Sequence, residues 1–205
     1  MQSKDVLGAL MQVIFASGNA GKVAEMQQLL RPVGFELTSL KDFGLEGAAE
    51  TATSFVENAL IKARAAALAT GLAAIADDSG LVVPGLNGEP GVFSARYAGD
   101  QANDASNNSK LLDQMAELDD RRAHFFCCLV FLQHATDPTP KIAFGRWDGE
   151  ILRQPQGAGG FGYDPLFYLP SENASAAQLP AAAKNQLSHR GRACRALLSQ
   201  LQDNA

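Results

Sequence analysis

The sequence has few of the features that mark several classes of protein. Its 205 residues include only three cysteines, and none has the spacing of a zinc site or a redox motif. No apolar run reaches the roughly 18 residues of a membrane-spanning helix. No cluster of lysine and arginine marks a nucleic-acid surface. We therefore expect no membrane and no nucleic acid as partner, and we expect reduced, buried thiols in a cytoplasmic protein.

The composition is that of an ordinary globular domain. Hydrophobic residues make up 46% of the chain, charged residues make up 19%, and the net charge is −5. A chain of this length and composition can bury a substantial core. Lys4 and the apolar run after it weakly resemble a signal peptide, but Gln12 interrupts that run. We expect residues 1–10 to be a short N-terminal extension and residues 11–205 to be a single α/β domain.

Hydrophobic periodicity predicts strands and helices that alternate along the chain. Short β-rich apolar runs indicate strands, whereas apolar residues on one face, with capping signals, indicate helices. The expected strands are 13–16, 35–40, 73–76, 122–133 and 141–147. The expected helices are 20–30, 54–70, 103–118 and 188–202, and the Gly- and Pro-rich residues 85–99 and 154–165 are expected to be loops. This alternation is typical of an α/β fold.

The segment Ser17–Lys22, SGNAGK, lies between the first predicted strand and the first predicted helix. Backbone N–H groups at the start of a helix, the helix dipole and one lysine together favour an anion such as a phosphate. The spacing is not that of a P-loop, which has four residues between its glycines and a Ser or Thr after its lysine. A plain turn with a solvated lysine is the alternative.

Two adjacent carboxylates, Asp77 and Asp78, follow the predicted strand 73–76. At the carboxyl end of a strand they would face the crevice in which α/β proteins bind ligands. Because adjacent negative charges repel, a hard cation such as Mg²⁺ is the usual compensation. From the residues alone we expect the two acids to hold Mg²⁺ at the strand tip. A solvated turn is the alternative.

Two further segments carry candidate ligand contacts. In Gly157–Pro165, GAGGFGYDP, glycines allow close approach of a ligand, and the ring of Phe161 or Tyr163 could stack on a planar base. Lys184 and Ser188–Arg190 place two cations and a histidine at the start of the last helix, where a cation opposes the helix dipole. The alternatives are a flexible loop whose aromatic rings fill the core, and a solvated helix start.

Five motifs, in this order, resemble those of the inosine/xanthosine triphosphate pyrophosphatases: SGNAGK, ETATSFVENALIKA, ADDSGLVVPGLNGEPGVFSARYAG, GGFGYDPLF and SHRGRA. The resemblance extends from about Gln12 to Leu201. It implies an α/β fold whose mixed central sheet and flanking helices form two lobes around a deep substrate cleft, in a homodimer. It also implies Mg²⁺ as cofactor and hydrolysis of deaminated purine triphosphates (ITP, dITP and XTP) to the monophosphate and pyrophosphate.

The same resemblance implies roles for individual residues. Asp78 would be the general base for water attack at the α-phosphorus, and Glu50 and Asp78 would bind the metal. The substrate contacts that it implies are Ser17, Gly18, Asn19, Ala20, Gly21, Lys22, Lys62, Ser79, Phe161, Gly162, Tyr163, Asp164, Lys184, His189 and Arg190. Ala49, Ala52 and residues 181–183 depart from the family's pattern, which often has acids or glycine at these positions.

The chemistry of the bases suggests how a substrate would be selected. Hypoxanthine and xanthine carry the acceptor O6 where adenine carries an amino group, and His189 and Arg190 can donate to O6. Guanine also has O6, so its rejection is expected from a backbone-lined slot near Phe161–Asp164 that offers no acceptor to its 2-amino group. Two alternatives stay open: a Maf-like pyrophosphatase acting on modified pyrimidine triphosphates, and a nucleotide-binding module without catalysis.

Overall fold

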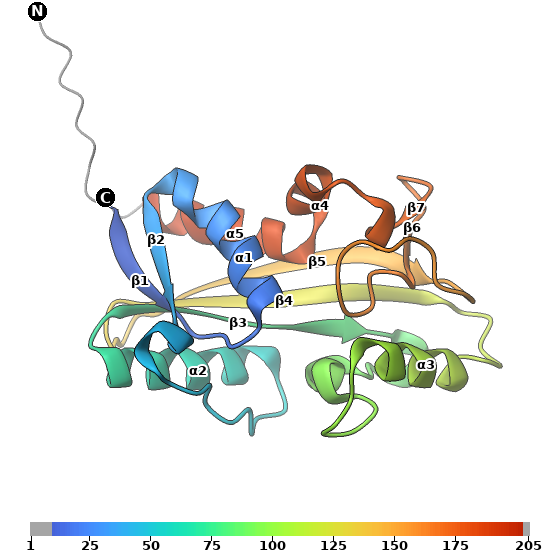
Figure 1. Cartoon of the computed structure of the whole chain (residues 1–205), viewed down its shortest axis with the longest axis horizontal. Helices are drawn as coiled ribbons and strands as arrows, with labels where there is room; N and C mark the ends of the chain where they lie inside the picture. Colours follow the sequence, from blue (N-terminus) through green and yellow to red (C-terminus); the bar gives the residue numbers. More distant parts are fainter. Residues whose placement is uncertain (1–9, 203–205) are drawn as a thin grey trace, which may run out of the picture.

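The strands form one mixed, seven-stranded sheet in the order β2-β1-β3-β4-β5-β6-β7 (Figure 1). The computed structural model describes residues 10–202, so nearly all of the expected extension 1–10 lies outside the described residues. β1 pairs in parallel with β2 and β3, and the other neighbours are antiparallel. The strands are β1 (Met11–Phe15), β2 (Phe35–Ser39), β3 (Ala73–Val82), β4 (Arg122–Leu132), β5 (Lys141–Ile151), β6 (Phe167–Leu169) and β7 (Ala174–Ser175).

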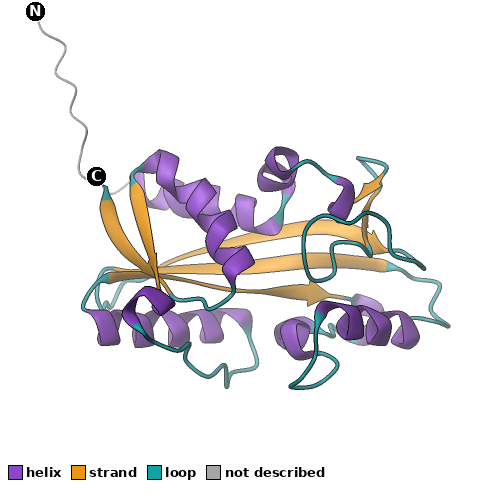
Figure 2. Cartoon of the chain, viewed as in Figure 1, coloured by secondary structure: helices purple, strands orange, loops and turns teal. Residues whose placement is uncertain are grey.

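Helices cover both faces of the sheet (Figure 2). In Figure 1, α1, α4 and α5 lie on one face, and α2 and α3 lie on the other. None of the described helices has the length and apolar character needed to cross a membrane. The helices are α1 (Ala20–Leu30), α2 (Phe55–Thr70), α3 (Asp104–Gln114), α4 (Ala181–Leu187) and α5 (His189–Gln202).

Apolar side chains form a core on each face of the sheet. On the face covered by α1 and α5, one cluster of buried residues includes Phe15, Phe131 and Leu197. On the opposite face α2 contributes mostly alanines, whose small side chains let the helix approach the strands closely. A third cluster contains Phe125 and Trp147 of the long strands and holds α3 and the segment before β6. The predicted α/β fold with a mixed sheet is confirmed.

The third strand is longer than the sequence pattern predicts. β3 continues through the two aspartates because β4 pairs with it as far as Val82. On its other side, β1 pairs with β3 only up to the register of Phe15 with Ile75. The expectation that the acids stand at a strand tip is therefore wrong for β3. They lie inside it, just beyond the point at which its neighbour β1 ends.

The sequence predicts the ends of helices more reliably than the ends of strands. The side chain of Ser54 caps α2 and Gly71 ends that helix in the left-handed conformation, so the predicted helix 54–70 is confirmed at both ends. The predicted helix 103–118 stops at Gln114, and the expected loop 85–99 contains the 3₁₀ segment Gly91–Arg96. The helix α4 was missed, although its three alanines are the strongest helix formers.

The contact between α5 and β5 allows a test of the packing. A Cβ on Gly145 would overlap the carbonyl group of His189, the first residue of α5. We expect Gly145→Ala to lower the free energy of unfolding by about 1–3 kcal/mol, the usual cost of overpacking. Chemical denaturation measures the change. Gly47→Ala is the matched control, because its added Cβ meets no atom within 4 Å and should change stability by less than about 0.5 kcal/mol. Equal stability of the two variants would contradict this packing.

Candidate active site

A pocket of about 200 Å³ lies along β3 beyond the point at which β1 ends. Segments far apart in the sequence converge on it, among them the start of α1, the first turn of α3 and the start of α5. Its lining comprises Asn19, Lys22, Ser79, Gly80, Leu81, Ser94, Ala95, Asp104, Asn107, Phe125, Phe161, Gly162, Tyr163, Asp164, His189 and Arg190. The fold therefore brings together residues from four of the five motifs quoted above.

The segment Ser17–Lys22 forms the start of α1. The side-chain oxygen of Asn19 caps the helix by accepting a hydrogen bond from the backbone N–H of Lys22 at 3.1 Å. The backbone N–H of Asn19 donates to the hydroxyl of Ser17 at 3.2 Å. The first N–H groups of a helix have no partner within the helix, so this turn presents donors and a positive dipole to an anion.

Asp77 and Asp78 point to opposite faces of the sheet, because successive side chains of a strand alternate. Asp77 faces α1 and α5, where its Oδ2 lies 3.0 Å from Lys22 Nζ and 3.5 Å from Arg190 Nε. Burial opposes ionisation of Asp77, but the charges of Lys22 and Arg190 outweigh burial and hold its pKa below the usual range. Asp77 thus remains ionised and fixes two cations at the pocket.

Asp78 faces α2, on which Asn58 and Lys62 lie one turn apart. Lys62 Nζ lies 2.9 Å from Asp78 Oδ1 and 2.6 Å from Glu50 Oε1. Asn58 Nδ2 donates to Asp78 Oδ2 at 3.3 Å, and Arg96 Nη1 donates to Glu50 Oε2 at 3.2 Å. Glu50 and Asp78, from segments 28 positions apart in the sequence, therefore converge on one ammonium group.

These neighbours shift the acidity of all three groups. Burial raises the pKa of Asp78, and the negative charge of Glu50 adds to the rise, although Lys62 opposes it. Burial also disfavours charge on Glu50, but Lys62 and Arg96 outweigh it and lower its pKa. Burial likewise disfavours charge on Lys62, but the surrounding carboxylates outweigh it and raise its pKa. Asp78 is therefore the carboxylate with the greater affinity for a proton.

The two adjacent aspartates do not form one metal site, which corrects the expectation drawn from their spacing. They lie on opposite faces of β3, and the carboxylates that approach one another are those of Glu50 and Asp78. Within residues 10–202, no group of three or more His, Cys, Asp or Glu side chains could hold a metal ion. Two carboxylates are nevertheless suitable for Mg²⁺, which commonly completes its shell with water and substrate phosphates.

The loop 157–165 forms one wall of the pocket. The carboxylate of Asp164 accepts hydrogen bonds from the backbone N–H of Phe161 at 2.8 Å and from Lys184 Nζ at 2.5 Å. Lys184 and Arg190 also lie over the ring of Phe161, 5.0 Å and 5.2 Å from its centroid. Asp164 and Lys184 therefore shape the loop, and Phe161 is the ring that two cations hold at the pocket.

Tyr163 belongs to the core instead. Its side chain is buried, and its hydroxyl donates a hydrogen bond to the carbonyl group of Ser94 at 2.8 Å. Burial also raises its pKa well above the usual range. Of the two rings expected to stack on a base, Phe161 is thus the better placed.

Two contacts from α3 hold this loop, and the sequence predicts neither. Asp104 accepts a hydrogen bond from the backbone N–H of Gly162 at 2.7 Å, and Asn108 Nδ2 donates to the carbonyl group of Gly162 at 3.0 Å. In Figure 1 the loop that precedes β6 extends toward α3. No pattern in the sequence connects residues so far apart, so these contacts could not have been predicted without the fold.

Arg190 is the most heavily paired cation of the pocket. Besides Asp77, it binds Glu25 Oε2 through Nη1 at 2.9 Å and donates from Nη2 to Ser79 Oγ at 3.0 Å. Glu25 was also missed. The available signal was its spacing of three residues from Lys22 on a predicted helix, because residues three apart share a helix face.

His189 lies beside Arg190 and is buried. Its ring stacks on Phe125, with centroids 4.7 Å apart and planes inclined by 13°. Burial, with the charges of Arg190 and Lys184, lowers the pKa of His189 well below the usual range. The imidazole is therefore neutral at neutral pH, and it lines the pocket.

Known sequences resemble this chain over nearly all of its length. The sequence model of the Ham1 family matches residues 13–200. The dITP/XTP pyrophosphatase of Vibrio cholerae serotype O1 is 50% identical over 194 residues, which cover 94% of this chain and 97% of the relative. That of Escherichia coli strain K12 is 49% identical over 196 residues, covering 95% and 100%.

Solved structures also resemble this chain over nearly all of its length. The HAM1 protein from Coxiella burnetii has a TM-score of 0.88 at 46% identity, and the match covers 95% of this chain and 100% of that one. The Staphylococcus aureus Ham1 protein has a TM-score of 0.84 at 37% identity with the same coverage. The family match and the extent of these identities show that the chain belongs to the Ham1 family.

Proposed function

We propose that this protein hydrolyses the deaminated purine nucleoside triphosphates ITP, dITP and XTP to the monophosphate and pyrophosphate. Its relatives named dITP/XTP pyrophosphatase match nearly the whole chain. The observation that carries the proposal is that β3 runs past an anion-binding helix start and an aromatic ring on one pocket and also carries Asp78, whose carboxylate converges with that of Glu50 on Lys62.

The triphosphate would bind at the start of α1. Lys22 and the free N–H groups of Ser17–Lys22 offer positive charge and donors to it. Lys62 lies next to Asp78, on the face of β3 that α2 covers. These two lysines would offset the negative charge that grows on the departing pyrophosphate.

Asp78 would act as the general base. It would accept the proton of a water molecule whose oxygen bonds to the α-phosphorus, while the bond from that phosphorus to the pyrophosphate oxygen breaks. Its raised pKa makes it a stronger proton acceptor than a free aspartate, whose pKa is about 4. Mg²⁺ held by Glu50 and Asp78 would neutralise phosphate charge and increase the acidity of water.

The base would bind between Phe161 and His189. The neutral imidazole of His189 can donate one N–H to O6 of hypoxanthine or xanthine, and it would leave that donor unpaired against the amino group of adenine. Loss of such a buried hydrogen bond can cost about 10⁴-fold in discrimination. Arg190, held by Asp77 and Glu25, can contribute a second donor from a fixed position.

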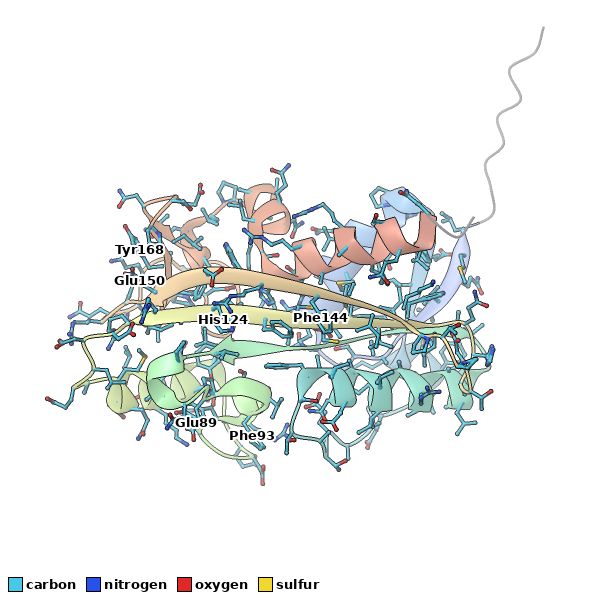
Figure 3. All side chains as sticks on the ribbon, turned by 180° about the vertical axis from the view of Figure 1, so that it is seen from behind. Glu89, Phe93, His124, Phe144, Glu150 and Tyr168 are labelled. Carbon is cyan, nitrogen blue, oxygen red and sulfur yellow. The ribbon has the colours of Figure 1, made fainter. Side chains whose placement is uncertain are left out.

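We also propose that two copies form a homodimer through the exposed side of β4 and β5. Figure 3 shows Phe93, His124 and Phe144 on the side turned to the viewer. Phe93 and Phe144 are 54% and 52% exposed, which is unusual for large apolar side chains. On β5 the residues that follow Phe144 on this side are Arg146 and Asp148, so opposite charges can pair across a two-fold axis.

The first test identifies the products. Wild-type protein is incubated with ITP, XTP, dITP, GTP and ATP, with Mg²⁺ or with EDTA, and pyrophosphate and orthophosphate are assayed separately. We expect pyrophosphate and the monophosphate from the deaminated purines alone, only with metal. Orthophosphate with IDP would refute attack at the α-phosphorus. Faster hydrolysis of pyrimidine triphosphates would favour a Maf-like enzyme, and binding without turnover would favour a non-catalytic module.

The second test removes the base. Asp78→Asn keeps the size of the side chain but cannot accept the proton, so we expect kcat for ITP to fall by about 10²- to 10⁴-fold. Asp113→Asn makes the same chemical change on the exposed side of α3 and should leave kcat unchanged. If the two variants had equal turnover, Asp78 would not be the base.

The third test concerns assembly. We expect the wild type to have twice the mass of one chain in sedimentation equilibrium, and Phe144→Glu to have the mass of one chain, because a buried carboxylate opposes association. Leu68→Glu is the matched control, since Leu68 is another large apolar side chain and is 78% exposed on α2. A monomeric wild type, or equal masses of the two variants, would contradict the proposed interface.

A further inference from the structure

Every oxygen of the two carboxylates assigned to Mg²⁺ already has a donor from the chain itself. Glu50 Oε1 and Asp78 Oδ1 both bind Lys62 Nζ, at 2.6 Å and 2.9 Å. The remaining oxygens accept from Arg96 and Asn58, at 3.2 Å and 3.3 Å. A carboxylate oxygen can accept a hydrogen bond and bind a metal ion at the same time, so the donor that a metal ion opposes is one that carries positive charge.

Lys62 is the donor that a metal ion would displace, because it alone bridges the two carboxylates. Its side chain is only 9% exposed, so water screens its charge little. An ammonium group and a divalent cation that approach the same oxygens repel each other strongly at such distances. Lys62 and the metal ion would thus compete for the position between Glu50 and Asp78.

A cavity beside Lys62 gives the displaced side chain somewhere to go. It has a volume of about 180 Å³, and its other lining residues include Ala16, Leu40, Ala48 and Ala66. Besides Lys62, all of its lining residues but one are alanine or leucine, and the exception, Glu46, offers a carboxylate to the displaced ammonium group. Ala16, which lines the cavity, directly precedes the segment Ser17–Lys22 that is expected to bind the triphosphate.

We propose that Lys62 is a positioning residue that holds Glu50 and Asp78 in the place of the metal until the metal arrives with the nucleotide. The triphosphate then gives the displaced ammonium group a new anionic partner. This inference rests on the proposed function, since it takes the nucleotide and Mg²⁺ as given. It makes metal binding weak in the protein alone and stronger with nucleotide, and the coupling must be reciprocal.

The direct test measures metal binding without nucleotide. The affinity of wild type and Lys62→Met for Mn²⁺, a spectroscopic substitute for Mg²⁺, is determined from the free-ion signal in electron paramagnetic resonance. In the wild type the metal ion must displace the Lys62 ammonium group and break its hydrogen bonds to the carboxylates. Lys62→Met removes that cost, so the affinity for Mn²⁺ should rise by about 10- to 100-fold. Arg96→Met removes the same charge from one oxygen of Glu50 at a more exposed position and should raise affinity by less than about fivefold.

A second measurement leaves the positive charge of Lys62 in place. In wild-type protein with ¹⁵N-labelled lysine, the Lys62 ammonium resonance, assigned with Lys62→Arg, is followed while Mg²⁺ and α,β-imido-ITP are added. We expect it to shift when both are present and to change little with Mg²⁺ alone at the same concentration. This readout stays informative even if Lys62→Met does not fold.

The outcomes separate this inference from the proposed function. If Lys62→Met binds Mn²⁺ no more tightly than wild type, or the Lys62 resonance stays unchanged with both ligands, the inference is wrong, although wild-type hydrolysis of ITP would still support the function. If wild-type protein neither hydrolyses ITP nor binds Mn²⁺ in the presence of α,β-imido-ITP, the proposed function itself fails.

Discussion

The unequal lengths of two neighbouring strands determine where this protein can bind a ligand. β3 has ten residues and β1 has five, so β3 lies between two strands only over its first residues. Beyond Ile75, β4 alone continues beside it, and side chains from α1, α3 and α5 approach instead. The pocket is a consequence of where β1 stops.

The alternation of a strand then assigns different tasks to two adjacent acids. Asp77 neutralises Lys22 and Arg190 on one face, which keeps both cations at fixed positions beside the pocket. Asp78 lies on the other face, where burial raises its pKa. Had the two acids shared a face, their repulsion would have raised the pKa of one of them strongly. Their separation allows one to serve as a counterion and the other to be a base.

Local interactions are the part of this molecule that the sequence predicts well. Ser54 and Gly71 bound α2 through contacts within a few residues, and Asn58 and Lys62 share a helix face because they lie four residues apart. The full length of β3, by contrast, depends on β4, which is more than 40 positions away. Contacts such as Arg96 with Glu50 likewise join residues 46 positions apart, so no local pattern could predict them.

The two ends of the site differ in how their charges are held. On the side expected to bind the base, Arg190 has three protein partners and Asp164 holds both Phe161 and Lys184, so that wall is organised in advance. On the side of Glu50 and Asp78, a single flexible ammonium group links the carboxylates. A preorganised wall reduces the entropy lost when a base binds. Lys62 offsets the charge of the two carboxylates while no metal ion is bound, which keeps the fold stable. The metal ion takes the place of Lys62 on Glu50 and Asp78 only when the substrate binds.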